Sequence, residues 1–163
     1  LHHRNPGTVG AILIQREMKC EIIADGIHIH PELIKMLLRD KPLDNIVMVT
    51  DSLKPTKQRT GPCMANGIPC KVGGDGAFIA LENPDLFLGS GLTMLQGFRN
   101  MLKWEIPIQQ ASQMSSTNPA RIYNFAKQGM LVPGYTADIV VLDKNLQMKG
   151  LFIDGNLVRD RFA

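Results

Sequence analysis

The sequence predicts an α/β fold, because two short apolar segments with the character of strands flank one amphipathic helix. The segments 20–25 and 45–51 are rich in Ile and Val, and each runs directly into ionisable residues. Residues 31–40 between them follow helical spacing. The expected buried side of this helix holds Leu33, Leu37 and Leu38. A strand, helix, strand unit normally gives parallel strands, and functional residues gather at the carboxyl ends of such strands. The pattern therefore indicates an enzyme.

Composition excludes several classes of protein. Of the 163 residues, 44% are hydrophobic and 20% are charged, as in ordinary globular proteins. The net charge of +3 is small and the basic residues are scattered, so no nucleic-acid partner is expected. No apolar run approaches the roughly 20 residues of a membrane span, and no signal peptide is recognised. We expect a cytoplasmic protein with no membrane partner. Because it starts at Leu1 without an initiator Met, we expect it to be part of a longer chain.

The three cysteines cannot all pair within the chain. Cys20 lies in an apolar strand, where a buried reduced thiol is expected. Cys63 and Cys70 have no neighbouring cluster of histidines, so a zinc site is not expected there.

Turn residues and periodicity predict the other elements. Thr8 is expected to cap a short helix, residues 52–67 to form a long mobile loop, and residues 68–81 to form a hairpin around Gly73–Gly76. Helical spacing is seen in 92–104 and again from 107 or 108 to 114, and Thr117 begins another short helix with Pro119 in its first turn. Strands are expected in 131–134, 138–142 and 151–158, the last broken by a turn at 154–156. The change in composition places a domain boundary near residue 128, which gives regions 1–128 and 129–163.

His28 and Asp51 are the strongest candidate site residues, because each follows the end of a predicted strand. The two side chains are expected to face one shared pocket. Asp51 could move a proton or simply begin a turn. In an extended segment His28 and His30 would share a face, a spacing that can bind a metal, but His30 is better explained as a helix-start residue before Pro31.

Two further segments could bind an anion. Arg4, in a loop that contains Pro and Gly, could form charge-assisted hydrogen bonds to a phosphate, although surface loops often carry Arg. The turn at 89–91 could offer backbone N–H groups to an anion or a sugar hydroxyl, or be only a turn.

The ordered set of these motifs resembles the carboxyl-terminal half of the N-acetylglucosamine-6-phosphate deacetylases of the amidohydrolase superfamily. The matching stretches are HHRNPGTVGA (2–11), IADGIHIHP (23–31), VTD (49–51), GSGLTM (89–94), NPAR (118–121), GYTADIVVLD (134–143) and DGN (154–156). They occur in the family's order and cover nearly the whole chain.

This resemblance implies the carboxyl-terminal part of a (β/α)8 TIM barrel, with the closing strands of a small β-sandwich in 129–163. Segments 20–25 and 45–51 would be the seventh and eighth barrel strands, and 68–81 an inserted hairpin. The family binds a divalent metal, zinc or iron, through residues of earlier strands. None of those ligands lies in this chain, so the 163-residue chain alone is expected to bind no metal and to be inactive.

The resemblance also implies a role for each site residue. Asp51 would be the general base and acid that removes a proton from the metal-activated water and returns it to the departing amine. His28 would contact the sugar phosphate or a hydroxyl, and Arg4 would clamp the phosphate across a homodimer interface. The sugar would be touched, mostly through backbone atoms, by Phe87, Leu88 and Gly89. Two positions depart from the family's usual residues, with Asn5 in place of Glu and Ser52 in place of Ala.

Three functions follow as hypotheses. The first is hydrolysis of N-acetylglucosamine 6-phosphate to glucosamine 6-phosphate and acetate by the longer protein. The second is a related amidohydrolase reaction on another N-acetyl amino sugar or a cyclic amide. The third is a non-catalytic remnant or cleavage product that persists as a structural or phosphosugar-binding piece.

Overall fold

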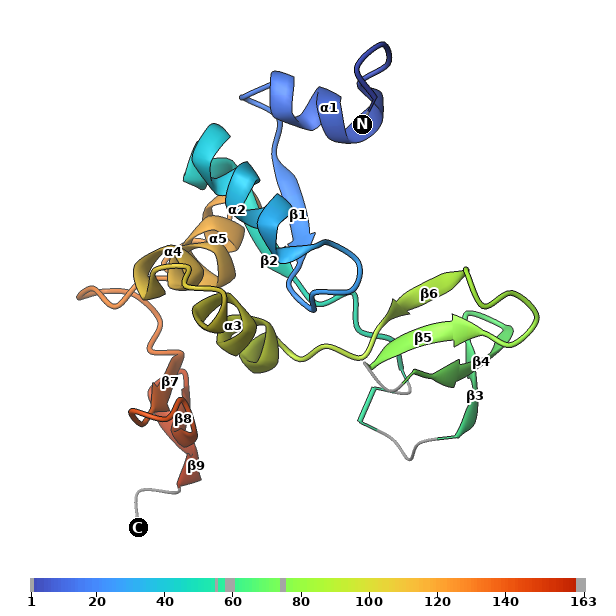
Figure 1. Ribbon diagram of the computed structural model, residues 1–163. Helices are drawn as coiled ribbons and strands as arrows, with labels where there is room; N and C mark the ends of the chain where they lie inside the picture. Colours follow the sequence, from blue (N-terminus) through green and yellow to red (C-terminus); the bar gives the residue numbers. More distant parts are fainter. Residues whose placement is uncertain (1, 55, 58–60, 74–75, 161–163) are drawn as a thin grey trace.

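Two parallel strands lie at the centre of the fold, with helices on one side and a four-stranded antiparallel sheet on the other, and the chain ends in a three-stranded antiparallel sheet (Figure 1). The computed structural model describes residues 2–54, 56–57, 61–73 and 76–160. Strands β1 (Cys20–Ile23) and β2 (Ile46–Val49) pair in parallel, with Cys20 opposite Ile46. The predicted strand, helix, strand unit is confirmed.

Helix α2 (Pro31–Asp40) crosses between the two strands, but its buried side differs from the prediction. Ile34 is fully buried, and Leu37 and Leu38 pack against the same core. Leu33, predicted to be buried, is 47% exposed. Positions 34, 37 and 38 follow the spacing of one helix face, which turns Leu33 toward solvent. A short 3-10 turn, Leu43–Asn45, then leads into β2.

The main core lies between the parallel pair and the helices of the second half of the chain. Helix α3 (Met94–Lys103) begins after Thr93, whose Oγ1 accepts a hydrogen bond from the Gln96 N–H at 3.3 Å. It ends at Trp104, as the spacing in 92–104 predicted. The buried members of this core are Cys20, Ile22, Ala24, Ile34, Ile46, Met48, Met101, Ile106, Ala111 and Met114.

The two short helices predicted after residue 107 form one continuous run instead. Helix α4 (Ile108–Ser112) passes through a π-helical turn (Gln113–Thr117) into α5 (Asn118–Ile122). Pro119 has no N–H and would crowd an ordinary α-helical carbonyl. The wider π turn directly precedes it, which explains why the run continues past this proline.

Helix α1 (Gly7–Ile14) does not begin at Thr8 as predicted. Thr8 lies inside the helix, and the residue at the helix start is Pro6, which makes no capping hydrogen bond with a side chain. The other end of the helix is fixed by Lys41, which is only 3% exposed. Its Nζ donates to the last carbonyls of this region, those of Ile12 at 3.0 Å, Gln15 at 2.9 Å and Arg16 at 3.3 Å.

A four-stranded antiparallel sheet replaces much of what the sequence predicted as loop. Its strands, in spatial order, are β3 (Pro62–Ala65), β4 (Ile68–Val72), β5 (Ala77–Ala80) and β6 (Phe87–Ser90). The hairpin of β4 and β5 is confirmed, although Gly74 and Asp75 of its turn lie outside the described residues. Strand β3 occupies residues 62–65 of the segment 52–67 that was predicted as a loop, and β6 includes the first two residues of the turn predicted at 89–91, so these parts of both predictions were wrong.

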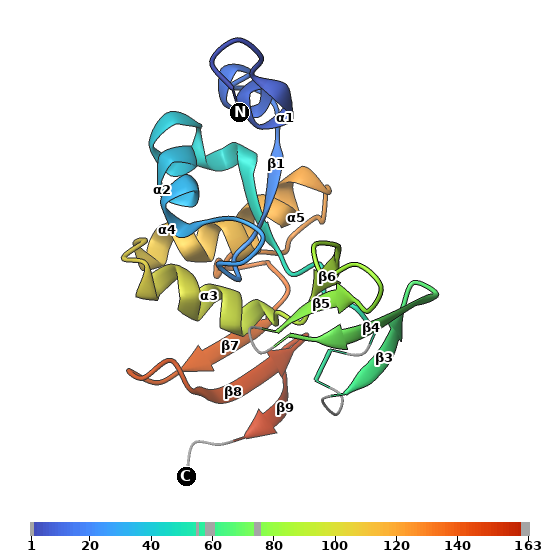
Figure 2. The same ribbon diagram turned by 45° about the vertical axis from the view of Figure 1, so that its right-hand side comes forward.

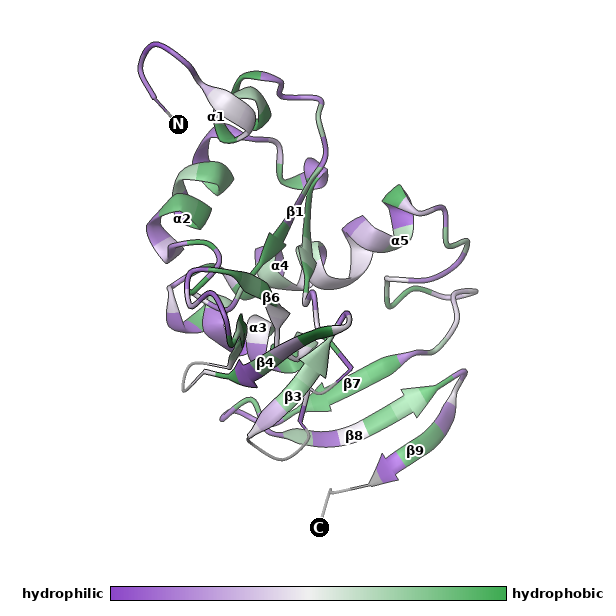
Figure 3. Cartoon of the chain, turned by 90° about the vertical axis from the view of Figure 1, so that its right-hand side faces the viewer, coloured by the Kyte–Doolittle hydropathy of each residue, from purple (hydrophilic) through white to green (hydrophobic). Residues whose placement is uncertain are grey.

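The last part of the chain forms a three-stranded antiparallel sheet below α3 (Figure 2). Its strands are β7 (Ile139–Leu142), β8 (Met148–Ile153) and β9 (Asn156–Asp160). The tight turn between β8 and β9 is confirmed, with positive φ at Asp154 and Gly155. Segment 131–134, predicted as a strand, is irregular. Much of β7 and β8 is coloured green, for hydrophobic residues, in Figure 3.

The described residues form a mixed α/β fold with two parallel strands and no closed barrel. Within the same residues, no helix has the length and apolar character required to cross a bilayer. The boundary near residue 128 stays a prediction.

Candidate functional site

The carboxyl end of β1 carries a buried aspartate that fixes the orientation of His28. The side chain of Asp25 is only 7% exposed. Its Oδ1 accepts the backbone N–H groups of Ile27 at 2.9 Å and of His28 at 3.0 Å. Its Oδ2 lies 2.6 Å from Nδ1 of His28. A carboxylate can only accept, so Nδ1–H is the donor, and Nε2 is left available to a ligand.

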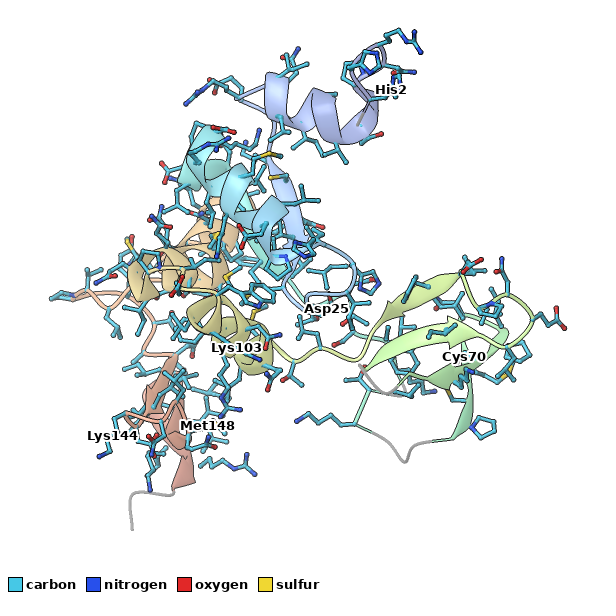
Figure 4. The ribbon with its side chains drawn as sticks, viewed as in Figure 1. His2, Asp25, Cys70, Lys103, Lys144 and Met148 are labelled. Atoms are coloured by element: carbon cyan, nitrogen blue, oxygen red, sulfur yellow. The ribbon has the colours of Figure 1, made fainter. Side chains whose placement is uncertain are left out.

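Helix α3 supports the turn that carries this pair, as Figure 4 shows for the region around Asp25. Asn100 donates from Nδ2 to the carbonyl oxygen of Ala24 at 2.8 Å. Gly26 has φ +80°, and a Cβ placed there would lie 3.1 Å from Cζ2 of Trp104. A side chain would therefore be opposed both by the backbone conformation and by the indole ring.

Asp51 follows β2 with a backbone that is tied to β6. It has φ +49°, and its carbonyl oxygen accepts the Ser90 N–H at 2.9 Å. The Leu53 N–H donates to the Ser90 carbonyl at 3.1 Å, and the Ser52 hydroxyl donates to the Leu92 carbonyl. The Asp51 side chain is exposed, and within the described part of the chain its carboxylate has no hydrogen-bond or ion-pair partner.

Strand β6 links the ends of β1 and β2. The ring of Phe87 meets the imidazole of His28 edge-on, with centroids 5.5 Å apart and planes at 61°. Two residues further on, Gly89 has φ +144°, and a Cβ there would lie 3.1 Å from the Asp51 carbonyl oxygen and 2.9 Å from Cγ of Leu53. Phe87, which contacts His28, and Gly89, which contacts Asp51, are two residues apart in this strand, a distance of about 7 Å. Strand β6 therefore brings the backbone of Asp51 close to His28.

A cavity of about 310 Å³ adjoins this junction. Its polar lining comes from Asp25, Ser90, Gln96 and Asn100. A larger and more apolar cavity, about 510 Å³, lies between α3 and the β7–β8 strands. Among the described residues, none of those predicted for the site lines either cavity. The smaller cavity adjoins the site through Asp25, the hydrogen-bond partner of His28.

The predicted site residues fall into two groups. His28, Asp51, Phe87, Leu88 and Gly89 are gathered around the ends of β1 and β2. No described contact joins the side chains of His28 and Asp51, so their shared pocket stays a prediction. Arg4 is exposed in the first loop, near His2, which lies far from Asp25 in Figure 4. Its backbone N–H donates to Nδ1 of His2 at 3.3 Å.

The helix-start interpretation of His30 agrees with its contacts. Nδ1 of His30 accepts the Glu32 N–H at 3.2 Å at the start of α2. Among the residues that the structure describes, no three His, Cys, Asp or Glu side chains gather as a metal-binding group.

Sequence reasoning missed Asp25 as a site residue. The signal was present, because an Asp–Gly pair directly after a strand favours a turn in which the carboxylate accepts nearby N–H groups. Asn100 carried no comparable signal, since its partner lies 76 residues away along the chain.

Comparison with known proteins gives these residues a family. The sequence profile of the Amidohydrolase family matches residues 11–158. An N-acetylglucosamine-6-phosphate deacetylase of Lysinibacillus sphaericus is 36% identical over 146 residues, which are 89% of this chain and 37% of that protein. An N-acetylgalactosamine-6-phosphate deacetylase of Escherichia coli O157:H7 is 31% identical, over 96% of this chain and 41% of that protein.

Solved structures of deacetylases are similar to this chain as well. The N-acetylglucosamine-6-phosphate deacetylase of Thermotoga maritima superposes with a TM-score of 0.88 at 30% identity, over 98% of this chain and 44% of that one. A mutant of the Mycobacterium smegmatis deacetylase in complex with N-acetyl-D-glucosamine-6-phosphate gives 0.88 at 25% identity, over 96% and 42%. The chain spans about 40% of the length of these two curated relatives. On the profile match and these relatives, the chain belongs to the amidohydrolase family.

Proposed function

We propose that this chain is the carboxyl-terminal part of a deacetylase that hydrolyses the acetamide of N-acetylglucosamine 6-phosphate. The relatives support the substrate class, and their fold supports β1 and β2 as the last two strands of a (β/α)8 barrel. The observation that carries the proposal is the junction at the carboxyl ends of these strands, where His28, held by Asp25, and the backbone of Asp51 both meet β6.

Asp51 is the proposed general base and acid. It would accept a proton from the water that attacks the acetamide carbonyl, and return it to the nitrogen of the departing amine. The carboxylate has the freedom for this role, because within the described residues no cation or donor engages it. The bonds of its carbonyl oxygen and of the following residues to β6 would hold its backbone in place.

His28 is the proposed sugar or phosphate ligand. Asp25 holds Nδ1 at 2.6 Å, so Nε2 would present a fixed lone pair to a hydroxyl, or a proton to a phosphate oxygen when the ring is charged. Phe87 packs against the imidazole and would provide an apolar wall for the sugar ring. Leu88 and Gly89 continue this wall along β6.

Arg4 is proposed to bind the 6-phosphate. A guanidinium forms bidentate hydrogen bonds with phosphate oxygens, and the exposed loop of Arg4 could meet a second subunit of a homodimer. The described residues do not form a set that could hold the zinc or iron ion of the family. We therefore propose that any such ion is bound by residues outside this chain.

The first test is the release of acetate from phosphorylated and unphosphorylated sugars. An enzyme that contains this chain is expected to hydrolyse N-acetylglucosamine 6-phosphate about 100-fold more efficiently than N-acetylglucosamine, because hydrogen bonds to a charged group contribute about 1.5 to 3 kcal/mol each and every 1.4 kcal/mol is a factor of ten. Comparable kcat/KM values for the two sugars would favour the alternative, an amidohydrolase for another substrate. The 4-epimer, N-acetylgalactosamine 6-phosphate, should be included, because one of the relatives carries that name.

The Asp25→Asn variant tests how His28 is positioned. The amide can accept the two backbone N–H groups but no longer favours the Nδ1–H tautomer, so we expect KM to rise about 10-fold with a smaller change in kcat. The measurement is steady-state kinetics together with the NMR signals of the His28 ring. An unchanged tautomer and an unchanged KM would contradict this role. The matched control is Asp85→Asn, an exposed turn residue outside the site.

The 163-residue chain on its own is expected to hold no stoichiometric zinc or iron and to release no acetate. Metal analysis and an acetate assay of the purified chain would check both expectations. A chain that binds one metal ion and turns over substrate would show that the ligand set lies within these residues, and would exclude the inactive remnant.

A further inference from the structure

Two of the three cysteines face each other across the first hairpin of the four-stranded sheet. Strands β3 and β4 are joined by Asn66 and Gly67, which have φ +52° and +79°, a tight turn of the kind that fixes hairpin register. This register places Cys63 directly opposite Cys70. Their Sγ atoms are 2.8 Å apart.

The backbone geometry of such a pair suits a disulfide. Directly opposed residues of an antiparallel ladder have Cα atoms about 4.5 to 5.5 Å apart, within the range that disulfides span. Closing the bond from 2.8 Å to about 2.05 Å would require only a small rotation of the two side chains.

The two thiols differ in access. Cys70 is fully buried in a small core with Ala65 and Phe78, whereas Cys63 lies at the edge of that core and is partly exposed (Figure 4 labels Cys70). Burial and the neighbouring Cys63 raise the pKa of the Cys70 thiol to about 11. Cys63 is therefore the thiol that a reagent in solution would reach first.

We propose that Cys63 and Cys70 form a reversible disulfide by exchange with a small-molecule disulfide of the glutathione type. The thiolate of Cys63 attacks one sulfur of oxidised glutathione, the glutathione S–S bond breaks, and one glutathione thiolate leaves. Sγ of Cys70 then attacks Sγ of Cys63 and releases the second glutathione, which takes the Cys70 proton. Two protein thiols lose two electrons, and oxidised glutathione is reduced to two thiols.

This disulfide does not depend on the proposed deacetylase function. It would link β3 to β4 at one edge of the four-stranded sheet. The opposite edge of the same sheet is β6, which contains Phe87 and Gly89. Leu53, which follows Asp51 by two residues, packs against the same small core.

The test is to treat the full chain with oxidised glutathione, block the remaining thiols with iodoacetamide after unfolding, and map the peptides by mass spectrometry. We expect a linkage between Cys63 and Cys70 within one chain, full alkylation of Cys20, and full reversal by dithiothreitol. Cys20 is an internal control, because it lies in the main core and burial raises its thiol pKa. Alkylation of all three cysteines after oxidation, a linkage through Cys20, or a linkage only between chains would overturn the proposal.

Two variants test the order of the steps. Cys70→Ser should stop the reaction at a glutathione adduct on Cys63, whereas Cys63→Ser should leave Cys70 unmodified. A persistent adduct on Cys70 in the Cys63→Ser variant would contradict the assigned order. The mapping of the unmodified sequence decides the proposal even if the Cys70→Ser variant does not fold.

Discussion

The Asp51→Asn substitution, made in an enzyme that contains this chain, is expected to reduce kcat for deacetylation about 1,000-fold. Asparagine keeps the size and the backbone contacts of the residue, including the carbonyl bond to the Ser90 N–H, but it neither accepts nor returns a proton at pH 7. KM should change little, because the proposed role concerns proton transfer rather than ground-state binding. Acetate release at saturating substrate is the measurement.

The matched control for this variant is Asp85→Asn, which removes an exposed carboxylate from the turn between β5 and β6. It should keep kcat within about twofold of the unmodified enzyme. If Asp51→Asn retains more than one tenth of the activity while folding normally, Asp51 is not the general base, and the assignment of this site fails.

The Asn118→Leu substitution is expected to lower the free energy of unfolding by about 3 kcal/mol. Asn118 is fully buried, and its Nδ2 donates to the carbonyl oxygens of Leu43 and Ile46, both at 2.7 Å. Leucine has a similar volume but no polar atoms, so both carbonyls would lose this partner, and Gln113 and Arg121 would lose the Oδ1 acceptor to which each donates at 3.3 Å. The residue therefore ties the π-helical run to the start of β2.

The effect of Asn118→Leu is measured by urea unfolding. At an unchanged dependence of the unfolding free energy on urea concentration, the shift of the midpoint gives the loss of stability. Asn145→Leu is the control, because Asn145 is exposed in the turn between β7 and β8 and its side chain makes no described hydrogen bond. That control should stay within about 0.5 kcal/mol of the unmodified protein. Similar losses of unfolding free energy for the two variants would show that the hydrogen bonds of Asn118 contribute little to stability.

The sequence was sufficient to predict the elements whose signal is local. The spacing of α2 and α3 reflects burial on one side of each helix, and the continuous apolar run of β2 reflects burial on both faces of that strand. Strands β3 and β6 were missed, although each pairs with a strand that is its neighbour in the sequence, β4 or β5. Pro62 in β3 and Gly89 in β6 are residues that weaken a strand pattern, and the hairpin signal of Asn66 and Gly67 was overlooked. The helix past Pro119 was predicted as two pieces, since nothing local indicates a π turn.

The site, like the fold, could be predicted only where its signal is local in the sequence. His28 and Asp51 were recognised because ionisable residues at strand ends have no obvious structural need to be there. Asp25 was missed, because its role depends on a turn that folds the carboxylate back onto the imidazole. The contact between Phe87 and His28 depends on β6, so it could not be inferred without the sheet.

A chimaeric enzyme tests the central claim most directly. This chain would replace the corresponding part of the Lysinibacillus sphaericus deacetylase, which it matches over 37% of that protein's length. Acetate release from N-acetylglucosamine 6-phosphate would then be compared with that of the same chimaera carrying Asp51→Asn. We predict hydrolysis by the first protein and about 1,000-fold slower hydrolysis by the second. A chimaera that unfolds in a single cooperative transition and binds its metal, yet shows the same rate with and without the Asp51 carboxylate, would contradict the account.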